Sequence, residues 1–150
     1  MFKSMKIKIY ALALSLLMLM VSCVNNEDLV KSGIAKEWKL VSVNNVKPEF
    51  TVYMRFDGGI FSIYQQLYTL DYLYYDGTYS VNGNILSGEY FDGSAWKSNY
   101  TLSLSNDGKR LRLVSEEKNP ITNIYEACTI PQSVIEEVST RSNTHFDYHL

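Results

Sequence analysis

Apolar and polar residues alternate along most of the chain after residue 34, in short stretches separated by turn sequences. One face of the stretch 50–56 carries the apolar side chains of Phe50, Val52, Met54 and Phe56, because successive side chains of a β-strand point to opposite faces. Similar alternation recurs and predicts eight strands, at about 36–43, 50–56, 60–66, 77–82, 84–91, 95–104, 110–115 and 121–130. This part of the chain is therefore expected to be all-β.

Turn sequences that contain glycine mark the ends of these strands. They occur at Asp57-Gly58-Gly59, Asp76-Gly77, Asn82-Gly83, Asp92-Gly93 and Asn106-Asp107-Gly108. Asn-Gly and Asp-Gly favour tight hairpins, because these residues tolerate the positive φ that such turns require. Strands joined in this way pair antiparallel, since parallel pairing needs a longer crossover. The simplest closed arrangement is an eight-stranded antiparallel up-and-down barrel, and the alternative is a β-sandwich.

Two segments depart from the alternation. The tyrosine-rich stretch 65–75 is either a wide loop between two strand ends or one long curled strand. After Pro131, residues 132–139 are expected to form a short helix that turns Val134, Ile135 and Val138 towards the barrel. The residues that follow, up to Leu150, are expected to form a flexible tail.

The first 22 residues have the pattern of an export signal. Three lysines, Lys3, Lys6 and Lys8, precede an apolar run from Ile9 to Val21. As a helix this run would be about 20 Å long, too short for the roughly 30 Å hydrocarbon core of a bilayer. The residues at its end, Leu19-Met20-Val21-Ser22-Cys23, resemble the lipobox of bacterial lipoproteins. The resemblance implies removal of the leader and attachment of acyl chains such as palmitate at Cys23.

These features divide the chain into four parts. They are a signal peptide at 1–22, a lipidated cysteine and tether at 23–33, a barrel at 34–130, and a short helix with a flexible tail at 131–150. The expected location is the bacterial cell envelope, on the outer membrane, with the leaflet left open. The membrane is thus one expected partner, through the covalent lipid.

The charge balance narrows the other partners. Removal of the three leader lysines leaves 11 basic residues against 16 acidic ones, a formal charge of about −5. Because phosphate binding needs a basic surface, nucleic acid is not an expected partner. With Cys23 lipidated, Cys128 has no cysteine partner within the chain and is interpreted as a small buried residue.

Several short motifs resemble, in their order, the lipocalin-like domain of bacterial lipoproteins, within the calycin group. They are Trp38-Lys39-Leu40, Met54-Arg55-Phe56-Asp57-Gly58-Gly59, Tyr75-Asp76-Gly77-Thr78-Tyr79 and Tyr100-Thr101-Leu102-Ser103-Leu104. The resemblance implies a lipocalin-like barrel over about residues 34–130, with Trp38 closing its floor. A barrel of this size either holds one small ligand or is filled by its own side chains, and the sequence leaves both open.

The chemistry-bearing residues favour binding over catalysis. Both histidines, His145 and His149, lie in the tail, and the predicted barrel contains no nucleophile with a base. We therefore expect no catalytic residue, no metal site and no cofactor. The candidate ligand-binding residues are on the apolar faces, Met54, Phe56, Tyr100 and Leu102. The candidate docking residues for a protein or glycan form a tyrosine-rich rim, Tyr68, Tyr72, Tyr74 and Tyr75, with Trp96 as a further aromatic candidate.

Two functions follow from these residues. The first is a lipid-anchored, non-enzymatic barrel that binds a small apolar or amphipathic molecule in its interior. The alternative is a barrel with a filled core that docks a protein or glycan through its tyrosine-rich rim.

Overall fold

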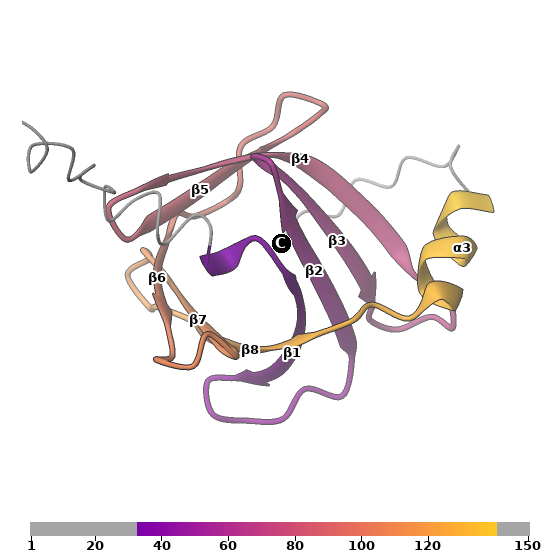
Figure 1. Ribbon diagram of the computed structural model, residues 1–150, viewed down its shortest axis with the longest axis horizontal. Coiled ribbons are helices and arrows are strands. Elements are labelled where there is room, and N and C mark those ends of the chain that lie inside the picture. Colours follow the sequence, from indigo (N-terminus) through magenta and orange to yellow (C-terminus); the bar gives the residue numbers. More distant parts are fainter. Residues whose placement is uncertain (1–32, 141–150) are drawn as a thin grey trace, which may run out of the picture.

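The computed structural model describes residues 33–140, which form a closed antiparallel barrel and one outer helix (Figure 1). The predicted signal peptide, Cys23, most of the tether and the tail lie outside the described residues. The eight strands are β1 (Glu37–Val43), β2 (Thr51–Asp57), β3 (Ile60–Gln66), β4 (Leu73–Asn82), β5 (Ile85–Tyr90), β6 (Tyr100–Leu104), β7 (Arg110–Ser115) and β8 (Thr122–Cys128). The helix is α3 (Gln132–Thr140).

Each strand pairs with its neighbour in sequence, and β1 also pairs with β8, so the barrel has no free edge. The prediction of an eight-stranded up-and-down barrel is confirmed, and the sandwich alternative is wrong. The pairing is uneven around the barrel. The ladder between β2 and β3 runs from Thr51↔Gln66 to Asp57↔Ile60, whereas β5 and β6 share only Ile85↔Thr101 and Leu86↔Tyr100.

The alternation of the sequence decides which side chains fill the barrel. Val52, Met54 and Phe56 of β2 are buried in the interior, as are Leu111 and Leu113 of β7. Burial of apolar area stabilises the fold by roughly 25 cal/mol per Å² removed from water. The interior is therefore the main hydrophobic core.

The strand registers define two ends of the barrel. At the N-terminal end lie the start of β1 and the turns 57–60, 82–85 and 104–110. At the loop end lie the connections 43–51, 66–73, 90–100 and 115–122. The stretch 65–75 thus consists of the end of β3, a loop at 67–72 and the start of β4, which begins at Leu73 rather than near residue 77. Residues 95–99, which we expected in a strand, belong to the connection before β6.

The segment before β1 closes the N-terminal end. Figure 1 shows this indigo segment within the ring of strands. Ile34 and Trp38 are fully buried, and the Trp38 indole N–H donates a hydrogen bond of 2.9 Å to the Ile34 carbonyl oxygen. Gly33 lies so close to β6 that a Cβ would be 2.7 Å from the Leu104 side chain. Tight packing and a hydrogen-bonded indole are thus found together at this end of the barrel.

Four of the five predicted glycine turns are confirmed. Gly58, Gly83, Gly93 and Gly108 have positive φ at turns or loops between strands. The prediction of a turn at Asp76-Gly77 is wrong, because both residues lie inside β4. A Cβ on Gly77 would be 2.0 Å from the Glu89 carbonyl oxygen of β5. Glycine is needed there for close approach of two backbones.

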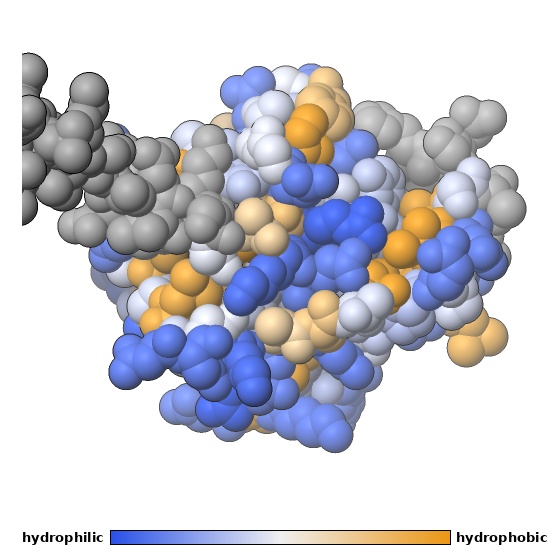
Figure 2. Space-filling view, viewed as in Figure 1, coloured by the Kyte–Doolittle hydropathy of each residue, from blue (hydrophilic) through white to orange (hydrophobic). Residues whose placement is uncertain are grey.

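Helix α3 packs on the outside of β2 and β3. Val134 is buried against Tyr53 and Tyr64, and Ile135 and Val138 pack on the same cluster, as we predicted from the sequence. Figure 2 shows hydrophobic side chains grouped beside this helix on a mixed surface. Glu37 fixes the chain before the helix, since one carboxylate oxygen accepts a 2.9 Å bond from Arg55 Nε and the other a 2.7 Å bond from the Ile130 N–H.

Candidate functional site

The loop-end half of the interior differs from the N-terminal half. In the N-terminal half, apolar side chains and aromatic rings pack against one another. The ring centroids of Phe56 and Tyr79, for example, are 4.8 Å apart. Both polar side chains that are buried in the described residues, Gln65 and Ser115, lie towards the loop end. The loop-end half is therefore the place in the interior where a molecule with a polar group would find partners.

A small cavity lies in this half of the barrel. Its apolar wall consists of Met54, Ile63 and Leu113, and its aromatic and polar wall of Tyr90, Trp96, Tyr100, Asn123 and Tyr125. The volume is about 30 Å³, the space that one water molecule takes in the liquid. The residues that line it carry no charge. In this conformation the interior is nearly filled by its own side chains.

Trp96 reaches the cavity from a loop rather than from a strand. A bridge between Glu89 and Ala95, with a 2.9 Å bond from the Trp96 N–H to the Gly88 carbonyl, places Trp96 beside Gly88. Its ring makes edge contacts with Phe61 and Tyr100, at centroid distances of 4.9 and 5.8 Å. The indole Nε1 is buried and has no hydrogen-bond partner. A buried donor without a partner costs about 1–3 kcal/mol.

Burial disfavours the ionised form of two tyrosines of the cavity, Tyr100 and Tyr125. Burial, with a smaller contribution from nearby Tyr100, raises the pKa of the Tyr125 hydroxyl well above its ordinary value. Burial also raises the pKa of Tyr100, with Glu117 adding to the shift. A neutral phenol can donate a hydrogen bond as well as accept one. The cavity can thus recognise an uncharged hydrogen-bonding group, and no nucleophile or base is activated in it.

The structure brings only some of the predicted ligand-binding residues to this cavity. Met54 and Tyr100 line it. Phe56 and Leu102 belong to the packed core of the barrel and do not line it. The residues of the cavity that the sequence did not single out are on β3, β5, β7 and β8, and their inward direction follows from the strand alternation once the strands are aligned.

The four tyrosines of the predicted rim do not form one surface. Tyr75 points into the barrel, where its ring meets Tyr90 at 6.2 Å, and Tyr72 packs with Tyr53 in the cluster under α3. Tyr74 lies on the outer face beside Ser62 and Asp76. Tyr68 is 96% exposed in the loop before β4. The pleat of β4 separates Tyr74 from Tyr75, because adjacent strand residues face opposite sides.

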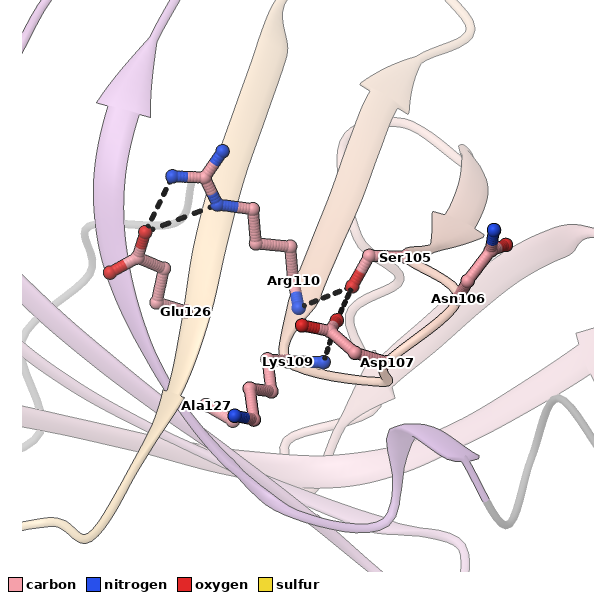
Figure 3. Close-up of a pocket in the computed structure, with 7 residues that line it drawn as sticks. All are labelled: Ser105, Asn106, Asp107, Lys109, Arg110, Glu126 and Ala127. Atoms are coloured by element: carbon pink, nitrogen blue, oxygen red, sulfur yellow. Dashed lines mark hydrogen bonds and ion pairs between the residues drawn. The ribbon is translucent and has the colours of Figure 1, made fainter.

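A larger hollow lies on the surface at the turn between β6 and β7. This open groove of about 590 Å³ is lined by exposed and half-buried residues, most of them polar. Figure 3 shows that they satisfy one another: Arg110 pairs with Glu126, and Asp107 accepts bonds from the Ser105 hydroxyl and the Lys109 N–H. The bond from Ser105 and that from the Lys109 backbone lower the pKa of Asp107. We prefer the interior cavity as the candidate site because it lies inside the barrel and one of its lining residues, Trp96, has a buried donor without a partner.

The described residues contain few other features that could carry a function, such as a free thiol, a metal site or a membrane-spanning helix. Cys128 is half-buried on the outer face near α3, and burial raises the pKa of its thiol, so it is less buried than we expected. No group of three or more His, Cys, Asp or Glu side chains within residues 33–140 is placed to hold a metal ion. Within the same residues no helix is both long and apolar enough to span a bilayer.

The strand order and the closed interior define a class: a small up-and-down β-barrel of the lipocalin-like type. No protein-family model matches the sequence, and no curated protein is detectably similar to it. Among solved structures, the chain is similar to a lipocalin-like protein from Bacteroides uniformis. The identity is 19% over 64% of this chain and 99% of that chain, with a TM-score of 0.49.

Two further solved structures are similar in the same way. An uncharacterized protein from Bacteroides eggerthii is 12% identical over 63% of this chain and 99% of that chain, with a TM-score of 0.48. The REP1-NXSQ fatty acid transporter is 14% identical over 67% of this chain and 99% of that chain, with a TM-score of 0.42. The assignment of the barrel rests on its own strand pairing.

Proposed function

We propose that the mature protein is a lipid-anchored barrel that binds a small apolar or amphipathic molecule at the loop end of its interior. The observation that carries this proposal is the interior cavity, whose walls combine aromatic rings with hydrogen-bonding side chains, and one of whose lining residues, Trp96, has a buried indole N–H without a partner. Ligand sites are typically lined in this way, by apolar and aromatic side chains with a few placed polar groups.

The size of the cavity sets a condition on this function. A volume of about 30 Å³ accommodates no organic ligand, so side chains at the loop end must move when a ligand binds. The short ladder between β5 and β6 lies beside the cavity. Only two residue pairs join β5 and β6, fewer than join any other neighbouring strands of the barrel, and local opening is favoured where the backbone pairing is short.

The anchor is supported by the leader and its cysteine. A basic and then apolar segment ends in Ser22-Cys23, and several acyl chains bind a bilayer stably because each buried methylene contributes about 0.8 kcal/mol. The first strand of the barrel, β1, begins at Glu37, fourteen residues after Cys23. We assign the protein to the cell envelope, at the outer membrane, and leave its leaflet open.

A second function is favoured by one specific observation. Tyr68 and Leu70, in the loop between β3 and β4, have exposed fractions of 96% and 91%. Together with a nearly filled interior, this loop supports an interaction subunit that docks a protein or glycan from outside. Of the predicted rim, only Tyr68 is fully available for that role.

Binding in the interior can be tested on a soluble form that begins at Val24. Fatty acids, sterols and haem should be added in turn while the thermal unfolding midpoint is measured. A ligand at 100 times its Kd stabilises the native state by about 2.7 kcal/mol, so a clear rise of the midpoint is expected for at least one class. Asn123→Leu removes a polar group of the cavity and should weaken that rise, whereas Tyr68→Ala should leave it unchanged. No rise with any of these compounds would reject the interior site in favour of the docking function.

Lipid attachment can be tested by growing the producing bacterium with labelled palmitate. The wild-type protein should take up label, and Cys23→Ser should abolish the uptake. Cys128→Ser is the matched control, because it removes the other cysteine and should keep full labelling. Label in the Cys23→Ser protein would show that the lipoprotein assignment is wrong.

A further inference from the structure

The position of Trp96 suggests what kind of molecule the cavity takes. Its ring occupies space that belongs to the inner face of β5, because a Cβ on Gly88 would lie 2.4 Å from Trp96 Cε2 and 2.7 Å from two further ring atoms. The ring therefore lies directly against the glycine. Phe61 and Tyr100 also contact the ring in edge-to-face geometry, at interplanar angles of 63° and 80°, so the indole fills a slot bounded by Gly88 and these two rings.

The ring is held in this slot without a polar anchor. Its Nε1 has no hydrogen-bond partner, whereas the other indole of the described residues, that of Trp38, donates to Ile34. Leaving the slot would let Nε1 bond to water. Trp96 also belongs to a connection that ends where the two-pair ladder of β5 and β6 begins, so the ring can move without breaking a long ladder.

We infer that the Trp96 ring occupies the binding site of a flat, uncharged ring compound, and that such a compound displaces the ring when it binds. The inference rests on the proposed function and names the ligand class for the same site. A two-ring system matches the indole in shape. A neutral hydrogen-bond acceptor on the ligand can be met by the hydroxyl of Tyr125 or the amide of Asn123, which line the adjoining cavity. A carboxylate there would be buried without a cation, since no lining residue is charged.

Coumarin is a suitable probe, because it has two flat fused rings and one carbonyl acceptor. Coumarin-3-carboxylate has the same rings with an added charge and serves as the matched control ligand. The chain contains two tryptophans, so labelling with 5-fluorotryptophan gives two fluorine resonances, and Trp96→Phe identifies the one from Trp96. Coumarin should bind, measured by calorimetry, and should shift the Trp96 resonance towards its solvent-exposed position while the Trp38 resonance stays fixed. The carboxylate should do neither.

Three variants test whether ring and ligand share the slot. Trp96→Ala empties it and should bind coumarin about tenfold or more tightly than the wild type, because an occluded site lowers apparent affinity by its open fraction. Gly88→Ala places a methyl group in the slot, so the Trp96 resonance should lie at its solvent-exposed position even without ligand. When Gly88→Ala is combined with Trp96→Ala, the tighter binding of coumarin that Trp96→Ala gives should be lost. Ser87→Ala, whose side chain meets Ser80 on the outer face, should change neither quantity.

The outcomes separate the two proposals. Binding of coumarin with an unmoved Trp96 resonance would overturn the displacement, and the interior function would stand. Failure of coumarin to bind, alongside stabilisation by a fatty acid or sterol, would overturn the flat-ring class alone. If no variant binds coumarin and no compound in the thermal panel stabilises the protein, both proposals fail.

Discussion

The two tryptophans of the chain lie at opposite ends of one barrel in opposite circumstances. Trp38 comes from the second position of β1, is fully buried, and donates its indole N–H to Ile34 at 2.9 Å. Trp96 comes from a loop, is partly buried, and has an Nε1 without a partner. The same type of side chain is thus buried near the N-terminal end with its polar group satisfied and lies at the loop end with that group unsatisfied.

This difference between the two tryptophans shows how a small barrel can combine a rigid N-terminal end with an adaptable loop end. Removing a fully packed indole whose N–H is hydrogen-bonded costs the free energy of transferring the ring, and it also costs the free energy of the cavity that is left. Moving an unsatisfied ring into water recovers a hydrogen bond and offsets part of that cost. We therefore expect the N-terminal end to contribute most to the stability of the barrel, and the loop end to be the part that changes conformation.

The largest expected effect comes from truncating the ring at the N-terminal end. Trp38→Ala should destabilise the barrel by about 3–5 kcal/mol, enough to unfold or nearly unfold a domain of this size. Lys39→Ala is the control, because Lys39 is exposed and its contact is with the outer ring of Tyr53, at 5.7 Å. Urea unfolding followed by circular dichroism measures both. Equal and small losses would show that Trp38 does not close the barrel.

A second effect concerns alkaline pH and the loop-end interior. Burial raises the pKa of Tyr125 in the folded state, so above its ordinary value of 10.0 only the unfolded chain ionises there. This contribution to stability is complete below pH 10 and is lost as pH rises, by up to about 1.4 kcal/mol per pH unit. Tyr125→Phe should flatten the decline of the unfolding free energy between pH 10 and 11. An unchanged slope would show that this hydroxyl is accessible in the folded state.

The smallest effect is expected at Trp96, when the same substitution is made in each tryptophan. Trp96→Phe keeps an aromatic ring and removes the unpaired N–H, so the free energy of unfolding should change by less than about 1 kcal/mol. Trp38→Phe removes one of the two hydrogen bonds that the Ile34 carbonyl accepts, since the Lys36 N–H still donates to it at 2.7 Å, and it leaves a void. This change should cost at least about 2 kcal/mol. The comparison between the two ends fails if chemical denaturation gives the same loss for both variants.

Much of the barrel could be predicted from the sequence because it depends on local rules. The inward direction of Val52, Met54 and Phe56 follows from the period of two, and turns such as that at Gly83 follow from positive φ. The apolar face of α3 follows from helical spacing, and Val134 is buried as expected. Each of these features depends on residues that are close in the chain.

The candidate site was less predictable because it depends on pairing between distant strands. Asp76-Gly77 has the composition of a turn, yet the approach of β5 to Gly77 makes it part of a strand. Tyr74 and Tyr75 are neighbours in sequence and lie on opposite sides of β4. Trp96 enters the barrel because its loop pairs with β5 beside a residue that has no side chain.

The sequence by itself determined the alternating strands, most of the turns, the short helix and the expectation of a lipid anchor at Cys23, since each depends on residue type and short spacing. Only the tertiary structure decided that β1 meets β8, that α3 covers Tyr53 and Tyr64, and that the interior is nearly filled. Closure and packing depend on the register of strands far apart in the chain. The space left inside is the small difference between the volume of the barrel and that of its side chains, which no local pattern specifies.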